Sequence, residues 1–239
     1  MELSISYYTA KGKRENNEDA VSLLEGSNSL LAIVADGLGG HEGGEIASNH
    51  AIAALNRILQ SQTPDEEELI DAICQANREI YEMQDPHSCM RTTLAALWLD
   101  GCRAFAANVG DSRIYQFRDG RILYQSVDHS VAQMAVLVGE LPQEQLRTSK
   151  DRNKLIRVVG DVRSPKVDCE ELFAQPGDRF LLCSDGFWEP VTEEIMLETM
   201  AGSATAQQWL CLMRQELERM NNPLQDNHTA IALMVNDLI

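Results

Sequence analysis

Five groups of acidic side chains lie at the ends of strand-like apolar runs, where a folded sheet would hold each carboxylate at its rim. The groups are Glu18 with Asp19, Asp36, Asp111, Asp185, and Asp226. Asp36 ends the apolar run 30–35, a pattern typical of a strand that is buried on both faces. Gly37 follows it, and a glycine lets the backbone and its carbonyl oxygen approach a ligand closely. For any single Asp-Gly pair, an ordinary turn is the simpler interpretation.

Convergence of these acids would cost stability unless protons or cations compensated their charge. Two carboxylates about 5 Å apart repel each other by roughly 3 kcal/mol at an effective dielectric constant of about 20. Four such groups would cancel a large part of the ~5–15 kcal/mol that stabilises an ordinary domain. An all-oxygen set of ligands suits Mg²⁺ or Mn²⁺ and not zinc.

The strands and helices expected around these acids indicate an α+β fold. Strands are expected at 3–9, 20–24, 30–35, 94–99, 102–109, 113–117, 122–125, 155–159, 167–173, 179–184 and 229–235. Helices are expected at 43–60, from a cap at Thr63 to about Met83, and at 126–138, 192–200 and 204–220. The polar segment 139–153 has no clear period and is the best candidate for a mobile flap. Short turns between strands, with helices grouped in pairs, favour α+β rather than alternating βαβ.

Composition restricts the class of protein and of partner. At 239 residues, one domain spanning 1–239 is expected. The net charge of −17 argues against nucleic acid as a partner, because phosphate backbones would be repelled. No run approaches the ~20 apolar residues of a membrane-spanning helix, and residues 1–14 lack the apolar centre of a signal peptide. The six cysteines show no C-x-x-C spacing, so we expect reduced thiols and a cytoplasmic location.

Seven short motifs occur in order along nearly the whole chain. They are RENNED (14–19), VADGLGGHEGGEIAS (34–48), TT (92–93), ANVGDSR (107–113), DHS (128–130), GDRFLLCSDGFWE (177–189) and DNHTAI (226–231). This ordered set resembles the metal-dependent serine/threonine protein phosphatases of type 2C in their compact bacterial form. The resemblance implies a β-sandwich of two antiparallel sheets flanked by pairs of α-helices, in four layers αββα. It also implies hydrolysis of phosphoserine and phosphothreonine by direct attack of a hydroxide that bridges two Mn²⁺ or Mg²⁺ ions, without a phosphoenzyme.

Matched residue by residue, the resemblance implies a set of metal ligands. Asp36 would bridge the two ions, and Gly37 would add its backbone carbonyl. Asp185 and Asp226 would complete the ligands of one ion, and Glu18 those of the other. The simpler interpretations are turn formers for Asp36 and Asp185, a solvated loop for Glu18, and an Asx turn that opens a strand for Asp226.

Four further residues receive supporting roles from the same resemblance. Asp111, together with Asp185, would help bind a third and weaker metal, and Asp19 would orient water beside the ligands. Arg14 would bind the phosphate, since a planar guanidinium can hold two phosphate oxygens at once. Asn227 would support the site by hydrogen bonds. A turn aspartate remains open for Asp111, and a surface arginine paired with local acids remains open for Arg14.

Three residues depart from the family pattern. Leu38 stands where eukaryotic relatives have a histidine proposed as the general acid, so the proton must come from water or from another residue that the sequence does not identify. His41 does not match that position and is interpreted as a loop histidine. Arg91 replaces a small residue before the two threonines, and either altered packing or an added positive group would follow.

The resemblance also implies partners. Phosphorylated proteins would be the substrates, and the phosphatase would oppose a Ser/Thr kinase, which some relatives do in type VI secretion control. A monomer without a membrane partner is expected. Two other functions remain open, a catalytically silent module that binds phosphoproteins and a hydrolase of small phosphate esters. The glycines at 39–40 and 43–44 lack the lysine of a P-loop, so nucleotide binding is not indicated.

Overall fold

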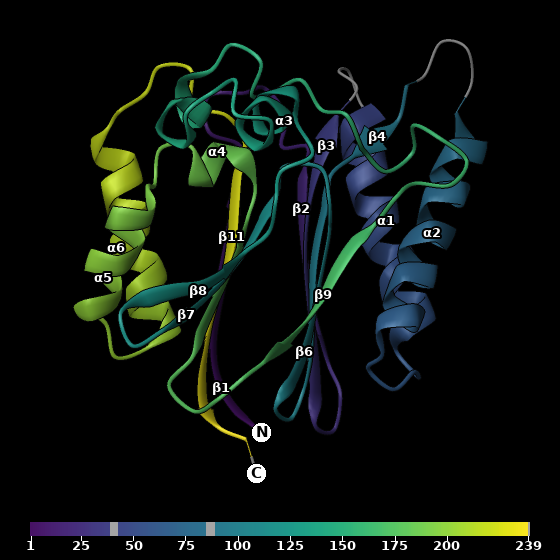
Figure 1. The fold of residues 1–239 in the computed structure, drawn as a ribbon. Helices are drawn as coiled ribbons and strands as arrows, with labels where there is room; N and C mark the ends of the chain where they lie inside the picture. Colours follow the sequence, from purple (N-terminus) through teal and green to yellow (C-terminus); the bar gives the residue numbers. More distant parts are fainter. Residues whose placement is uncertain (39–42, 85–88, 239) are drawn as a thin grey trace.

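Two antiparallel β-sheets stack face to face, and a pair of long helices covers the outer face of each (Figure 1). The computed structural model describes residues 1–38, 43–84 and 89–238. The first sheet contains, in spatial order, β1 (Glu2–Ala10), β11 (His228–Asp237), β10 (Arg179–Cys183), β7 (Arg113–Arg118) and β8 (Arg121–Gln125). The second contains β2 (Asp19–Glu25), β3 (Ser29–Leu38), β5 (Leu94–Asp100), β6 (Arg103–Val109) and β9 (Asp168–Phe173), with β4 (Arg91–Thr92) paired to β3.

The helices complete the four layers expected from the resemblance, and the predicted fold class is confirmed. Helices α1 (Gly43–Leu59) and α2 (Glu66–Met83) cover the second sheet, and α5 (Glu193–Ala201) and α6 (Ala206–Arg219) cover the first. Three short helices lie at one end of the sandwich (Figure 1), namely α3 (Val131–Leu137), α4 (Asp185–Trp188) and the 3-10 helix η1 (Gln143–Thr148). None of the helices formed by the described residues is long and apolar enough to cross a membrane.

Strand β3 is buried on both faces, as its continuous apolar run predicts. Successive side chains of a strand point to opposite faces. One face packs against α1 and α2 through Leu31, Ile33 and Ala35. The other face packs between the two sheets through Leu30, Ala32 and Val34. Burial on both sides fixes the register of β3. The same register carries Asp36 to the rim of the second sheet.

Two predicted helix starts are wrong because other side chains supply the caps. Helix α2 is capped by Asp65, whose carboxylate accepts the backbone N–H of Glu67 at 2.9 Å, so Thr63 is not the cap. Helix α3 begins at Val131 and not near Ser126, because the Ser130 hydroxyl caps it.

The predicted strand at 155–159 is also wrong. Only isolated bridges form there, from Leu155 to Ser130 and from Val159 to Thr92. The chain does not make a simple turn at Asp185. Instead, Asp185 is the first residue of the short helix α4. The flap candidate contains η1, and its Arg152 contacts Glu189 just beyond α4 at 2.5 Å.

Candidate metal centre

Asp36 is held at the end of β3 by main-chain contacts. It lies opposite Asp19 in the β2–β3 register. Its N–H donates to the Thr93 hydroxyl at 3.1 Å, and its carbonyl accepts the Thr92 hydroxyl at 2.9 Å and the Thr93 N–H at 2.8 Å. The two threonines of the TT motif therefore fix the backbone from which this carboxylate projects.

Gly37 allows three backbone segments to meet beside Asp36. Its N–H donates to the Glu18 carbonyl at 3.2 Å. A side-chain carbon at Gly37 would lie 2.2 Å from the Gly44 carbonyl oxygen, and one at Gly44 would lie 2.6 Å from Glu18 Oε2. Both glycines are therefore required by space, and the Glu18 carboxylate lies against the start of α1.

Asp185 and Asp226 lie just beyond the paired strands β10 and β11. Gly186, next to Asp185, has no room for a side-chain carbon, which would lie 2.0 Å from the Asn227 carbonyl oxygen. The Ser184 hydroxyl donates to Asp19 Oδ2 at 2.7 Å and accepts the Thr229 N–H at 3.0 Å. This hydroxyl joins the rims of the two sheets, so acids far apart in the sequence share one end of the sandwich.

Burial and mutual repulsion raise the pKa of the central acid. The pKa of Asp36 lies well above its ordinary value, because its carboxyl is withdrawn from solvent and faces Asp19, Asp185 and Asp111. The pKa of Asp111 is also raised well above its ordinary value, by burial and then by the charge of Asp185. These four acids are close enough to disfavour one another's ionisation.

The neighbouring acids show the same effect. Burial, partly offset by the hydrogen bond from Ser184, raises the pKa of Asp19 to about 7. Burial, with the charges of Glu189 and Asp226, raises the pKa of Asp185 to about 6. A positive charge among these carboxylates would remove the repulsion.

Glu18, Arg14 and Asn227 connect the first loop to the start of β11. The Arg14 guanidinium pairs with Asp226 at 2.5 Å. Asn227 accepts the Glu18 N–H at 2.9 Å and donates to the carbonyls of Lys11 and Asn16, each at 2.9 Å. Burial raises the pKa of Glu18, with Asp226 adding to the rise and Arg14 opposing it. Asn227 thus holds the loop that carries both Arg14 and Glu18.

The described residues fit a divalent cation, although they do not form a ready-made cage. Within the described ranges, no three His, Cys, Asp or Glu side chains are arranged to hold a metal ion as they stand. One contact compensates charge instead, the Arg14–Asp226 pair, whereas Asp185 faces Asp36 and helps to raise the pKa of Asp36. Asp19 Oδ1 is buried without a hydrogen-bond partner, which is rare for such an oxygen. An all-carboxylate set with raised pKa values and an orphaned oxygen suits Mg²⁺ or Mn²⁺.

The departures from the family pattern have different outcomes. Arg91 pairs with Asp161 at 2.6 Å, so its positive charge is partnered. Leu38 is the last residue of β3, and it pairs with Arg91 of β4. His41 lies outside the described residues.

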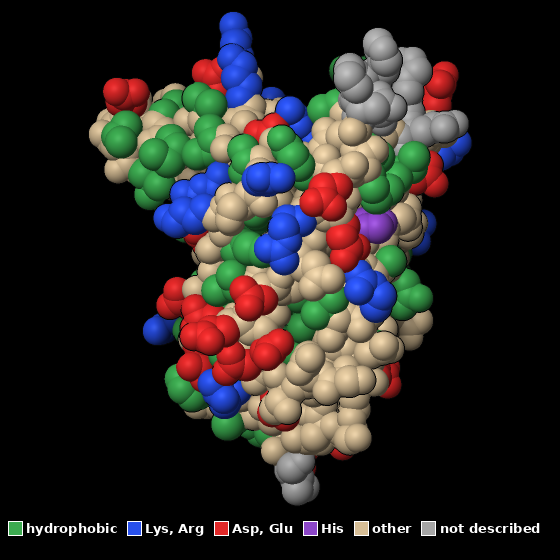
Figure 2. Space-filling view, turned by 90° about the vertical axis from the view of Figure 1, so that its right-hand side faces the viewer, with side chains coloured by type: hydrophobic (Ala, Val, Ile, Leu, Met, Phe, Trp, Pro, Cys, Tyr) green, Lys and Arg blue, Asp and Glu red, His purple; other side chains and the backbone are tan. Residues whose placement is uncertain are grey.

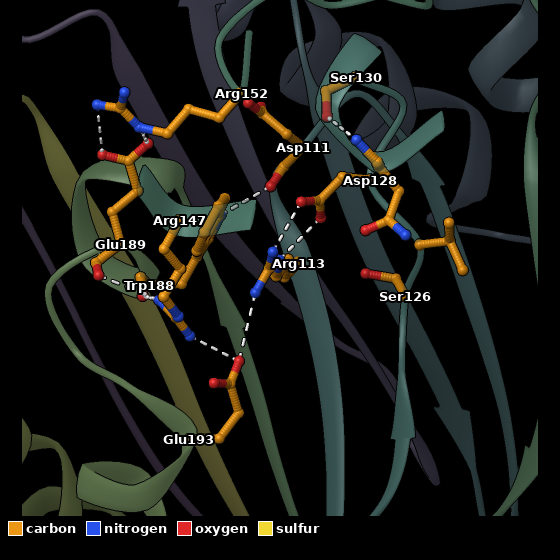
Figure 3. Close-up of polar contacts among 12 residues, drawn as sticks. Asp111, Arg113, Ser126, Asp128, Ser130, Arg147, Arg152, Trp188, Glu189 and Glu193 are labelled. Carbon is orange, nitrogen blue, oxygen red and sulfur yellow. Dashed lines mark hydrogen bonds and ion pairs between the residues drawn. The ribbon is translucent and has the colours of Figure 1, made fainter. Parts of the chain in front are cut away.

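Several residues that contact the acids carry no local sequence signal of their own. Arg113, Asp128 and Trp188 stand in the quoted motifs, and the structure joins them beneath Asp111 (Figure 3). Ser184 links the sheets, and only its place in the SDG motif could have indicated a function.

Comparison with known proteins agrees with this geometry. The family model for protein phosphatase 2C matches residues 9–227. The serine/threonine protein phosphatase PstP of Mycobacterium tuberculosis is 36% identical over 194 residues, which are 78% of this chain and 36% of the relative. This chain therefore spans only about a third of that relative's length. The serine/threonine phosphatase stp of Listeria monocytogenes is 32% identical over 210 residues, 83% of each chain.

Solved structures show the same fold. The catalytic domain of PstP in complex with two manganese ions superimposes with a TM-score of 0.81 at 32% identity, covering 99% of this chain and 100% of the other. PppA, a regulatory component of the type VI secretion system in Pseudomonas aeruginosa, has a TM-score of 0.79 at 26% identity and covers 98% of each chain. The family match, the αββα layers and the shared acidic rim lead to one conclusion. The chain belongs to the protein phosphatase 2C family and is a homologue of the bacterial serine/threonine protein phosphatases.

Proposed function

We propose that this chain is a metal-dependent protein phosphatase that hydrolyses phosphoserine and phosphothreonine in proteins. The observation that carries the proposal is the gathering of Asp19, Asp36, Asp111 and Asp185 at one end of the sandwich, where burial and neighbouring carboxylates raise the pKa of each. Two Mn²⁺ or Mg²⁺ ions bound there would supply positive charge for the phosphate and activate a water for attack. The manganese complex of the related PstP domain supports this choice of metal.

The chain's own residues divide the work of binding and orientation. Asp36 would contact both ions and Gly37 would offer its carbonyl, while Asp185 and Asp226 would hold one ion and Glu18 the other. These residues lie at strand ends, at the start of α4 and in the loop before β2, and hydrogen bonds to Thr93 and Asn227 hold the backbones of Asp36 and Glu18. Rigid placement of ligands is what phosphoryl transfer needs, because the protein supplies positioning and charge stabilisation.

Supporting residues act around this set. Asp111 and Asp185 would bind a third, weaker ion, Asp19 would orient water through its free oxygen, and Asn227 would hold the loop of Glu18. Arg14 would exchange its contact with Asp226 for the phosphate oxygens once a cation takes that carboxylate. Leu38 cannot transfer a proton, so water would protonate the leaving alkoxide.

The cellular setting follows from the same proposal. We propose that residues 1–239 form a single catalytic domain that works in the cytoplasm on proteins phosphorylated by a Ser/Thr kinase. The six cysteines are free thiols, which supports a reducing compartment. The likeness to PppA makes type VI secretion one pathway in which to look for substrates.

Replacement of Asp36 or Asp185 by asparagine tests the proposal. Each variant should lose at least about a thousandfold of the Mn²⁺-dependent turnover of a phosphothreonine peptide, because a neutral amide binds a divalent cation poorly. Asp237→Asn, at the far end of β11, is the matched control and should retain activity. Near wild-type turnover in either site variant would contradict the proposal, and faster cleavage of sugar phosphates than of phosphopeptides would reassign the substrate class.

A further inference from the structure

Trp188 connects the two elements that carry Asp111 and Asp185. It is the last residue of α4, the short helix that begins at Asp185. Its indole N–H donates to the backbone carbonyl of Asp111 at 2.8 Å, and the side chain is 2% exposed. A single buried hydrogen bond therefore joins the helix of one acid to the turn of the other.

The indole is itself held in place. The Arg113 guanidinium lies 3.4 Å from the centre of the Trp188 ring and is fixed by two hydrogen bonds to Asp128, at 2.8 and 2.7 Å. Figure 3 shows the contact from the ring to Asp111 beside the paired contacts from Arg113 to Asp128. Arg147 of η1 also lies over the ring, at 5.1 Å, and donates to the Trp188 carbonyl. Because these contacts fix the orientation of the indole ring, its N–H points at the Asp111 carbonyl.

The turn that carries Asp111 has little freedom of its own. Gly110 has φ +106°, and a side-chain carbon there would lie 2.7 Å from the Thr93 side chain. The Gly110 N–H donates to His129 at 3.1 Å, and the Ser112 hydroxyl contacts Thr93 at 2.7 Å. The hydrogen bond from Trp188 is a further contact to this turn, and it connects the turn to the helix that begins at Asp185.

We propose that Trp188 is a positioning residue that sets the spacing of Asp111 and Asp185 and so the affinity of the cation they share. The inference rests on the proposed function, in which these two acids hold the third and weaker ion. Asp185 also serves one of the two tighter ions, but the indole N–H holds the turn of Asp111, which serves the third ion alone. Loss of the indole N–H should therefore weaken one ion and leave the other two unchanged.

Trp188→Phe tests this inference, because it removes the N–H while keeping an aromatic ring over Arg113. Trp209→Phe is the matched control. Trp209 is also fully buried, lies under an arginine, Arg179, at 5.7 Å, and donates its N–H to a backbone carbonyl, that of Met196, at 3.0 Å. It belongs to α6, in the helical layer that covers the first sheet. Asp111→Asn is the reference for loss of the weaker ion.

The readout is Mn²⁺ binding, followed by electron paramagnetic resonance of the free ion during titration of each metal-free variant. Trp188→Phe should weaken the third ion about fivefold, the size expected for one buried hydrogen bond, with the first two dissociation constants unchanged. Trp209→Phe should bind all three ions as the wild type does. Excess Mn²⁺ should restore turnover of p-nitrophenyl phosphate in Trp188→Phe, which a loss of folding would not allow.

The possible outcomes separate this inference from the function beneath it. A third ion bound equally well by Trp188→Phe and the wild type, but lost in Asp111→Asn, would overturn the role of Trp188 alone. Equal weakening of all three ions would show a merely structural effect and would also overturn it. A wild-type chain that binds two ions and no third would remove the inference while the two-ion function stands. A wild-type chain that binds no Mn²⁺ would overturn both.

Discussion

Arg14 has a partner in this structure that differs from the one its proposed role requires. Its guanidinium contacts Asp226 at 2.5 Å, and its side chain is 60% exposed. An exposed ion pair contributes only about 0–1 kcal/mol, so a cation at Asp226 or an incoming phosphate can displace it at small cost. The pair is thus compatible with a metal-free resting arrangement of the loop.

Arg14→Ala should raise the KM for a phosphothreonine peptide about tenfold and lower kcat less. A hydrogen bond to a charged group is worth about 1.5–3 kcal/mol, and a contact made equally in the ground and transition states appears in KM. Arg57→Ala is the control, since Arg57 makes a similar exposed pair with Glu79, at 2.7 Å, on the helical layer. An unchanged KM in Arg14→Ala, measured by steady-state kinetics, would argue for a surface arginine.

His129 is held in one neutral tautomer by its neighbours. Its Nδ1 accepts the Gly110 N–H at 3.1 Å, so the proton lies on Nε2, which donates to Asp168 Oδ2 at 3.0 Å. Burial lowers the pKa of His129, with Arg157 also lowering it and Asp168 opposing. A proton on Nδ1 would leave the Gly110 N–H without an acceptor.

This arrangement predicts a loss of stability in acid. Because the pKa of His129 is lower in the folded chain than in the unfolded one, the unfolded chain binds more protons below about pH 6.5. The contribution of His129 is therefore present above that pH and lost as the pH falls. His129→Asn keeps an acceptor but cannot titrate, so in EDTA its Tm should fall less between pH 7.5 and 5.5 than that of the wild type. Equal falls in both chains would contradict this account.

Among the elements, β7 and the loop before α3 are joined by a buried ion pair. Arg113 and Asp128 are 1% and 3% exposed, and two hydrogen bonds connect them. Arg113 also donates to the Tyr115 hydroxyl at 2.9 Å. Removal of the Asp128 charge would leave the buried Arg113 guanidinium with a longer ion pair, to Glu193 at 3.3 Å, and such a loss costs more than the pair contributes.

Asp128→Asn should lower the free energy of unfolding by about 3–5 kcal/mol. Glu171→Gln is the matched control, because the Arg103–Glu171 pair joins β6 and β9 at 2.6 Å but is exposed at 48% and 37%. That control should cost about 0–1 kcal/mol. Urea unfolding in EDTA measures both. Similar losses in the two variants would mean that burial does not decide the strength of the pair.

The sequence predicted those elements whose pattern is local. The run 30–35 predicted a doubly buried strand, and β3 is one, while the period of 43–60 predicted α1 almost to its ends. The helix expected from 126 fails because Ser126 accepts the distant Ile114 N–H, at 2.9 Å, and the next polar residues serve tertiary contacts. Strand 155–159 does not form because the backbone of this segment makes two isolated bridges to different partners, Ser130 and Thr92, and no continuous ladder.

The placement of the acids at the two ends of local apolar runs was predictable, whereas the side chains that contact them were not. Trp188 and Arg113 appear as ordinary aromatic and basic residues until β7 and α4 are brought together. Ser184 caps α4 without a side-chain hydrogen bond, since its hydroxyl serves Asp19 instead. Such contacts join residues that are far apart in the sequence, and the hydrophobic periodicity of a segment does not indicate them.

Charge is unevenly distributed over the whole molecule, in which acids exceed bases by 17. Figure 2 shows acidic side chains gathered in the lower left of one face, with most Lys and Arg side chains above them. The segment 147–166 carries basic residues at 147, 150, 152, 154, 157, 163 and 166, and acids only at 151 and 161. Val159 of this segment pairs with Thr92, whose hydroxyl donates to Asp36. This basic segment therefore lies beside the acidic rim, and four of its bases, Arg147, Arg152, Lys154 and Arg157, are paired with acids.

Anomalous diffraction from crystals grown with Mn²⁺ would show whether the fold gathers acids that are far apart in the sequence around divalent cations. We predict two strong manganese peaks, both contacted by Asp36, with Asp185 and Asp226 on one and Glu18 on the other, and Arg14 released from Asp226. Peaks elsewhere on the surface, or no peak among these carboxylates, would contradict the account.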